Sequence, residues 1–119
     1  MSDRQRKVTL QELREVIAWL DSETDEAGNS LRHPYQIGEA YFIRTVTFHY
    51  TGKLVAVWPK ELVLEEAAWI ADDGRFADAL ESGEFNEVEP YPMKARVIIN
   101  RDVIVDAIVW KKPLPRKQK

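Results

Sequence analysis

The sequence predicts an α+β domain, with an N-terminal helix packed on a mostly antiparallel five-stranded sheet or small barrel and one short inserted helix. Apolar residues near the start of the chain recur at three- and four-residue steps, which is typical of one face of an amphipathic helix. The remainder holds runs of β-branched and aromatic residues separated by turn-forming residues, which is typical of short strands.

Length and composition favour one domain over residues 1–119. The chain is 45% hydrophobic and 31% charged, as in ordinary globular proteins. A net charge of −3 makes binding of long nucleic acid unfavourable. Cysteine is absent, which excludes disulfides and thiolate metal sites and suits a reducing cytoplasm. We see no membrane-length apolar run and no signal peptide.

The first third of the chain predicts one helix between two polar segments. Residues 1–7 are charged and expected to be flexible. Residues 8–22 predict a helix, because Thr9 and Glu12 have the spacing of a capping box. Residues 23–37 are acidic and polar and predict a linker.

Residues 38–110 predict a β-rich core. Strands are expected at 41–50, 53–58, 61–65, 96–100 and 103–110, the last of them central in the sheet because it is strongly apolar. Thr51-Gly52 is expected to turn the first hairpin, and residues 84–92 are expected to form a loop.

A short helix and a basic tail complete the prediction. The helix should begin after Asp72 or Asp73 and end at Gly83, a natural left-handed terminator. Residues 111–119 form a basic, proline-containing tail, which could contact a partner through charge.

Arg44 is the odd residue on the first predicted strand. If that strand runs to Tyr50, Arg44 shares a face with Phe42, Val46 and other apolar residues. It is either a rim arginine whose stem packs on the sheet or a guanidinium held for a phosphate or carboxylate. Thr47 would line the opposite face. Asp106 stands in an apolar run and should lie at an edge or pair with an arginine.

The most unusual stretch is residues 67–76, which combines Trp69, Arg75 and Phe76 with two aspartates and a glycine. Aromatic faces suit stacking of a nucleobase, and a guanidinium fork suits phosphate. Asn86 could read an adenine edge. The alternative is a strand end and a capped helix with core aromatics. The ligand-binding candidates are Arg44, Thr47, Trp69, Arg75, Phe76 and Asn86.

Catalytic signatures are absent from the sequence. There is no nucleophile elbow, no phosphate-binding glycine loop and no metal-ligand pair on a helix. His33 and His49 belong to different predicted elements. We therefore expect no catalytic residue, no metal site and no cofactor, and a protein that is not an enzyme but binds a small anionic ring system.

Several runs carry a resemblance to a known family. They are Ile43-Arg44-Thr45-Val46-Thr47, Tyr50-Thr51-Gly52-Lys53, Ala68-Trp69-Ile70-Ala71, Gly74-Arg75-Phe76 and Asn86-Glu87-Val88-Glu89-Pro90. They resemble a group of small phage and prophage proteins that overlaps the first Thoeris anti-defence family. The resemblance covers residues 38–110 and the proline-rich end, and it does not match ligand-contacting residues one by one.

The resemblance implies a signal sponge acting in the host cytoplasm. Such proteins bind a cyclic ADP-ribose isomer made by a bacterial immune enzyme, and some bind cyclic oligonucleotides, without cleaving the ligand. They form homo-oligomers with pockets between subunits.

Three alternatives stay open. An anti-CRISPR-like protein–protein inhibitor would use the acidic segments 23–26 and 81–89. An Sm-like RNA-binding module would match a helix followed by five strands, although no basic stripe supports it. An enzyme that degrades the signal would release an altered nucleotide.

Overall fold

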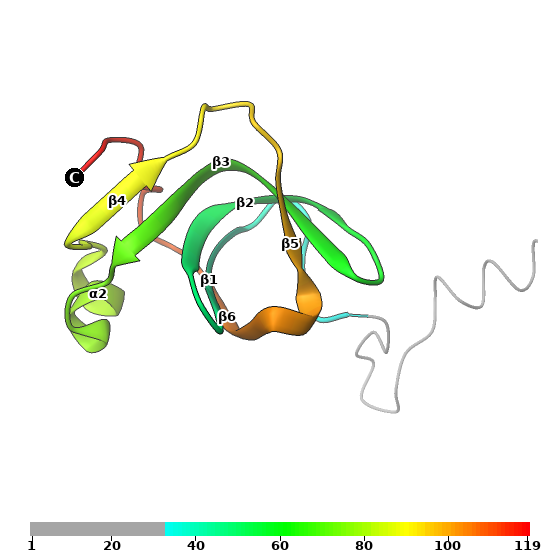
Figure 1. The fold of residues 1–119 in the computed structure, drawn as a ribbon, viewed down its shortest axis with the longest axis horizontal. Helices are drawn as coiled ribbons and strands as arrows, with labels where there is room; N and C mark the ends of the chain where they lie inside the picture. Colours follow the sequence, from blue (N-terminus) through cyan, green and yellow to red (C-terminus); the bar gives the residue numbers. More distant parts are fainter. Residues whose placement is uncertain (1–32) are drawn as a thin grey trace, which may run out of the picture. The chain divides into compact units, whose positions relative to one another are not determined.

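The computed structural model describes residues 33–119 (Figure 1). The predicted flexible start at 1–7, the helix at 8–22 and most of the linker at 23–37 lie outside these residues. Within the described residues, Gln36 to Lys119 form one compact unit. The single-domain organisation therefore stays a prediction.

The compact unit is built on a six-stranded antiparallel sheet. Its strands are β1 (Ala40–Thr45), β2 (His49–Val57), β3 (Glu61–Asp72), β4 (Glu87–Pro90), β5 (Val97–Asn100) and β6 (Ile104–Val109). The strand order is β4-β3-β2-β1-β6. The long β3 pairs with β5 through its first half and with β4 through its second half. The predicted mostly antiparallel sheet with one short helix is thus confirmed.

The sheet is curved, and β5 and β6 are joined at the bottom of the view in Figure 1. β5 leads through a 3-10 turn, η1 (Arg101–Val103), into β6, which returns to pair with β1. The prediction of a central fifth strand is wrong, because β6 stands at the end of the strand order and pairs with β1. β4 was missed: it forms within the expected loop at 84–92 by pairing with the end of β3.

The first hairpin turns earlier than predicted. The chain reverses at residues 46–48, where the Thr45 hydroxyl donates to the Phe48 carbonyl oxygen at 2.6 Å and accepts from the Phe48 amide at 2.9 Å. A side-chain hydroxyl thus closes the turn in place of a glycine. The predicted strand at 41–50 is divided between β1 and β2, so Val46 and Phe48 do not continue the face of Arg44.

Gly52 lies inside β2 rather than in a turn. It stands opposite Tyr41 on β1, and a Cβ atom there would meet the side chains of Leu64 at 3.0 Å and Ala67 at 3.2 Å. The glycine is therefore required for close packing between strands and not for chain reversal.

Both faces of the curved sheet carry an apolar layer. The adjacent residues Phe42 and Ile43 are both buried, and neighbouring strand residues point to opposite faces. The layer around Phe42 includes residues from β1, β3, β4 and the helix, one residue after the helix and one after β6. They are Phe42, Ala68, Ile70, Ala79, Phe85, Val88 and Trp110. The helix α2 (Phe76–Ser82) and the tail residue Leu114 pack against this layer.

The inserted helix begins later than predicted. β3 continues through Asp72, and α2 starts at Phe76 with Arg75 as an N-cap that makes no side-chain capping bond. Asp72 instead accepts a hydrogen bond from the Gly74 amide at 2.8 Å. The predicted end is confirmed: Gly83 has a φ of 77° and donates its amide to the Ala79 carbonyl oxygen.

The basic tail at 111–119 packs on its own domain. Arg116 donates to the carbonyl oxygens of Ala67 at 2.9 Å and Tyr91 at 2.7 Å. Lys119 and Val88 exchange two backbone hydrogen bonds, each of 3.0 Å. The tail is therefore fixed to the β3–β4 side of the sheet (Figure 1), and contact with a partner through its charge stays a prediction.

Candidate functional site

A groove lies where β2 begins and β3 ends. Residues 47–49 and 69–74 line it, and its volume is about 410 Å³, within the range of small-molecule sites. We call it the aromatic groove. It brings together two predicted ligand-binding residues, Thr47 and Trp69, which come from different elements.

Two aromatic rings form one wall of the aromatic groove. The rings of Phe48 and Trp69 meet edge to face, with centroids 5.5 Å apart and an interplanar angle of 83°. Phe48 is 47% exposed, whereas Trp69 is half-buried. The Trp69 indole nitrogen is buried without a hydrogen-bond partner among residues 33–119. This wall offers a stacking surface, whereas the indole N–H is enclosed and not exposed to solvent.

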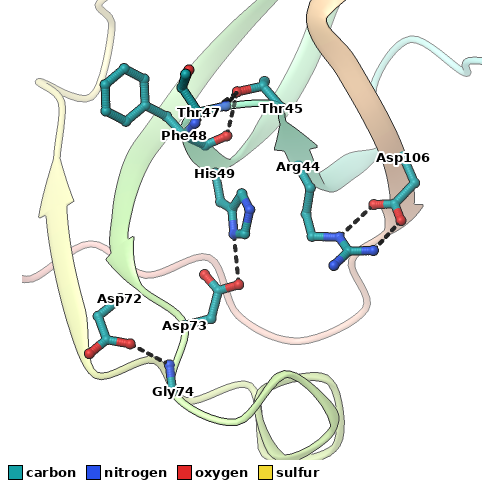
Figure 2. A network of polar contacts seen from close by, with 9 residues as sticks. All are labelled: Arg44, Thr45, Thr47, Phe48, His49, Asp72, Asp73, Gly74 and Asp106. Carbon is teal, nitrogen blue, oxygen red and sulfur yellow. Dashed lines mark hydrogen bonds and ion pairs between the residues drawn. The ribbon is translucent and has the colours of Figure 1, made fainter.

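The other side of the aromatic groove is acidic. Asp72 and Asp73 line it together with His49, and His49 Nδ1 lies 2.6 Å from Asp73 Oδ2 (Figure 2). Carboxylates repel phosphate and accept hydrogen bonds from N–H groups. The groove interior therefore suits a ring with N–H donors better than a phosphate group.

Arg44 is already engaged by its own fold. Its Nε donates to Asp106 Oδ1 at 2.8 Å, and a second guanidinium nitrogen contacts Asp106 Oδ2 (Figure 2). This bidentate bond raises the pKa of Arg44 and lowers that of Asp106. The guanidinium carbon also lies 4.2 Å from the ring centre of Phe76, a cation–π distance. The predicted pairing of Asp106 with an arginine is confirmed.

These polar groups form a row across the strands. Arg44 lies opposite Asp106 on β6 and opposite His49 on β2. Beneath them, the ring of buried Phe42 contacts His49 edge-on at 5.9 Å and Phe76 at 6.2 Å. Through these contacts of Phe42, the groove residue His49 and the first residue of α2, Phe76, both pack on the apolar layer.

Arg75 and Asn86 border the aromatic groove through Gly74. Arg75 is exposed, follows Gly74 in the chain and has no ion-pair partner within the described residues. A Cβ atom on Gly74 would lie 3.0 Å from Asn86 Oδ1, so the amide packs on the glycine, and the Asn86 backbone donates to the Asp72 carbonyl at 2.9 Å. Asn86 thus supports the loop that lines the groove.

The six predicted residues fall into three places. Thr47 and Trp69 line the aromatic groove, Arg75 and Asn86 border it, and Arg44 and Phe76 stack on each other. The sequence prediction missed Phe48, His49 and Asp73 as groove residues. The signal that could have found them is the hydroxyl of Thr45, which closes the turn at residues 46–48 and places His49 at the start of β2.

Comparison with protein-family models, curated proteins and solved structures finds no significant match to this chain. Within residues 33–119, no group of three or more histidine, cysteine, aspartate or glutamate side chains is arranged to hold a metal ion. None of the helices in this part of the chain has the length and apolar character needed to cross a membrane.

Proposed function

We propose that this protein is a phage-encoded, non-enzymatic binder of a cyclic nucleotide immune signal, such as a cyclic ADP-ribose isomer or a cyclic oligonucleotide, in the host cytoplasm. The observation that carries the proposal is the aromatic groove, which has a volume of about 410 Å³ and a wall formed by the rings of Phe48 and Trp69. A purine stacked on such a wall gains about 1–3 kcal/mol.

The charges around the groove favour one orientation of the ligand. The base enters, because its ring can stack on the aromatic wall and its amino group can donate to Asp72 or Asp73. The phosphates stay outside, away from these carboxylates, where the exposed guanidinium of Arg75 is available. Arg44 contributes less in this arrangement, because Asp106 already occupies two of its donors.

A single groove is too weak to sequester a signal. One stack of about 1–3 kcal/mol and two charge-assisted hydrogen bonds of about 1.5–3 kcal/mol each are opposed by at least about 4 kcal/mol of lost freedom. The remainder is at most about 5 kcal/mol, short of the ~8 kcal/mol of micromolar binding. We therefore include a homo-oligomer in the proposal, with a second subunit closing the groove.

Calorimetric titration with a cyclic ADP-ribose isomer tests the site. Trp69→Ala removes the stacking wall and should weaken binding by about 1–3 kcal/mol, or about five- to 150-fold. Arg75→Ala removes the phosphate contact and should weaken binding about tenfold or more. Mass spectrometry of ligand released by heat should find it unaltered.

Matched substitutions elsewhere control this titration. Trp58 is 58% exposed, and Arg96 is exposed beside Glu65; neither lines the aromatic groove. Trp58→Ala and Arg96→Ala should bind as the unmodified protein does, and circular dichroism should show every variant folded. Equal affinity of the Trp69 and Trp58 variants would contradict the site.

Hydrolysis of the bound signal is a second candidate function, favoured by the contact of His49 with Asp73 at 2.6 Å. An aspartate that holds one imidazole nitrogen leaves the other free to take a proton from water. Within the described part of the chain, Thr47 is the only hydroxyl side chain that lines the groove. Product analysis separates the candidates: an altered nucleotide, lost in His49→Gln, would indicate an enzyme.

A further inference from the structure

A second cavity lies beside the tail, and the proposed function does not use it. Its walls come from residues 83–85, which follow α2, from Val88 on β4, and from residues 114–117 and 119 of the tail. Its volume is about 370 Å³, enough for a small ligand. We call it the tail cavity.

The tail cavity is cationic, unlike the aromatic groove. Arg116, Lys117 and Lys119 line it together with a single carboxylate, Glu84, so its side chains carry a net charge of +2. Lys119 Nζ lies 3.1 Å from Glu84 Oε2, which leaves Arg116 and Lys117 without a carboxylate partner among residues 33–119. A protein of net charge −3 thus concentrates unpaired positive charge at one concave place.

Arg116 is held in position without being neutralised. Its two bonds go to the carbonyl oxygens of Ala67 and Tyr91, which are uncharged acceptors, and a guanidinium has five N–H donors. The charge is therefore not cancelled by a carboxylate, and the side chain is already ordered, which lowers the entropy cost of binding an anion.

The rest of the tail is also fixed, so the tail cavity exists before any ligand arrives. Lys119 and Val88 exchange backbone hydrogen bonds, Leu114 packs against the layer of Phe42, and the Trp110 indole nitrogen donates to the Pro113 carbonyl at 3.4 Å. The apolar part of the lining comes from Phe85, Val88, Leu114 and Pro115.

We propose that the tail cavity binds a small phosphomonoester with an apolar or aromatic group. The phosphate carries a charge of about −1.5 to −2 at neutral pH, close to the net charge of the lining side chains, and it would contact Arg116 and Lys117. The apolar group would rest on Leu114, Pro115 and the edge of Phe85. This site is independent of the aromatic groove and of the cyclic nucleotide proposed there.

Phenyl phosphate is a suitable probe, read by the backbone amide shifts of the full chain in nuclear magnetic resonance spectra. We expect saturable shifts at residues 84–88 and 114–119, with residues 69–74 unaffected, and weaker effects from phenol or inorganic phosphate alone. Lys117→Glu, at an exposed position, should raise the Kd about tenfold, and added salt should raise it further.

Two comparisons make the result decisive. Lys94→Glu reverses an exposed lysine that does not line the tail cavity and should leave the Kd unchanged. Trp69→Ala should also leave it unchanged, so failure of the aromatic groove and failure of the tail cavity are separable. Shifts that do not saturate, that fall outside the tail cavity, or that weaken equally in the Lys94 and Lys117 variants would overturn the proposal.

Discussion

Phe42 and Phe48 lie six residues apart and provide a matched test of the apolar layer under the polar row. Phe42 is 1% exposed, and its ring lies 5.3 Å from that of Phe85 and 5.5 Å from that of Trp110. Phe48 is 47% exposed. Removing a buried phenyl ring costs about 3–5 kcal/mol, and each aromatic pair adds about 0.5–1.5 kcal/mol.

Phe42→Ala should therefore lower the free energy of unfolding by about 4 kcal/mol, a large part of the stability of a small domain. Phe42→Leu keeps most of the volume and should cost about 1–2 kcal/mol. Phe48→Leu loses one half-exposed edge-to-face pair, with Trp69, and should cost about 0.5 kcal/mol, the low end of the range for such pairs. Urea unfolding followed by circular dichroism measures all three. Equal costs for Phe42→Leu and Phe48→Leu would show that the helix and tail do not pack on this layer.

Three further predictions concern charge, backbone and ionisation. Asp106→Asn should lower the free energy of unfolding by at most about 1 kcal/mol at pH 7, because the pair with Arg44 is exposed. Since the pKa of Asp106 is lowered, the difference in stability between the variant and the unmodified protein should vanish as the pH falls below 3.8 through the folded-state value. Urea unfolding at pH 7 and pH 2 measures both. Gly83→Ala should cost about 1 kcal/mol in the same assay, because φ is 77° and the new methyl would meet Lys112 Cδ at 2.5 Å; an unchanged midpoint would count against the left-handed cap. Burial and the neighbouring Tyr91 raise the pKa of Tyr50 above 10.0. The contribution of Tyr50 to stability is therefore complete below pH 10 and is lost as the pH rises through the raised pKa. In absorbance titrations, the tyrosine transition at the highest pH should disappear in Tyr50→Phe, and its persistence would show that the assignment is wrong.

Features that depend only on residues close to one another in the sequence were predicted well. The strand-forming runs and Gly83 as the end of α2 follow from local propensity and left-handed geometry. The turn at 46–48 was missed because the Thr45 hydroxyl closes it, a signal weaker than the glycine at position 52. Gly52 is needed because Leu64, which is distant in the sequence, packs closely against it.

The candidate site was predicted in part for the same reason. Trp69 was recognised from the unusual composition of its stretch, and Thr47 from a predicted strand that is a turn in the structure. The contact of His49 with Asp73 joins the start of β2 to the segment after β3, a pairing that depends on register. β4 likewise forms only because the end of β3 is there to receive it, and its sequence ends in a proline that favours an edge position.

The most direct test of the proposed function is capture and release. The protein is mixed with a lysate verified to contain immune nucleotide signals, freed of unbound ligand and denatured by heat, and the released material is identified by mass spectrometry. We predict an intact cyclic nucleotide from the unmodified protein and from Trp58→Ala, and little from Trp69→Ala. A folded protein that releases no nucleotide would contradict the account and would favour a protein–protein inhibitor.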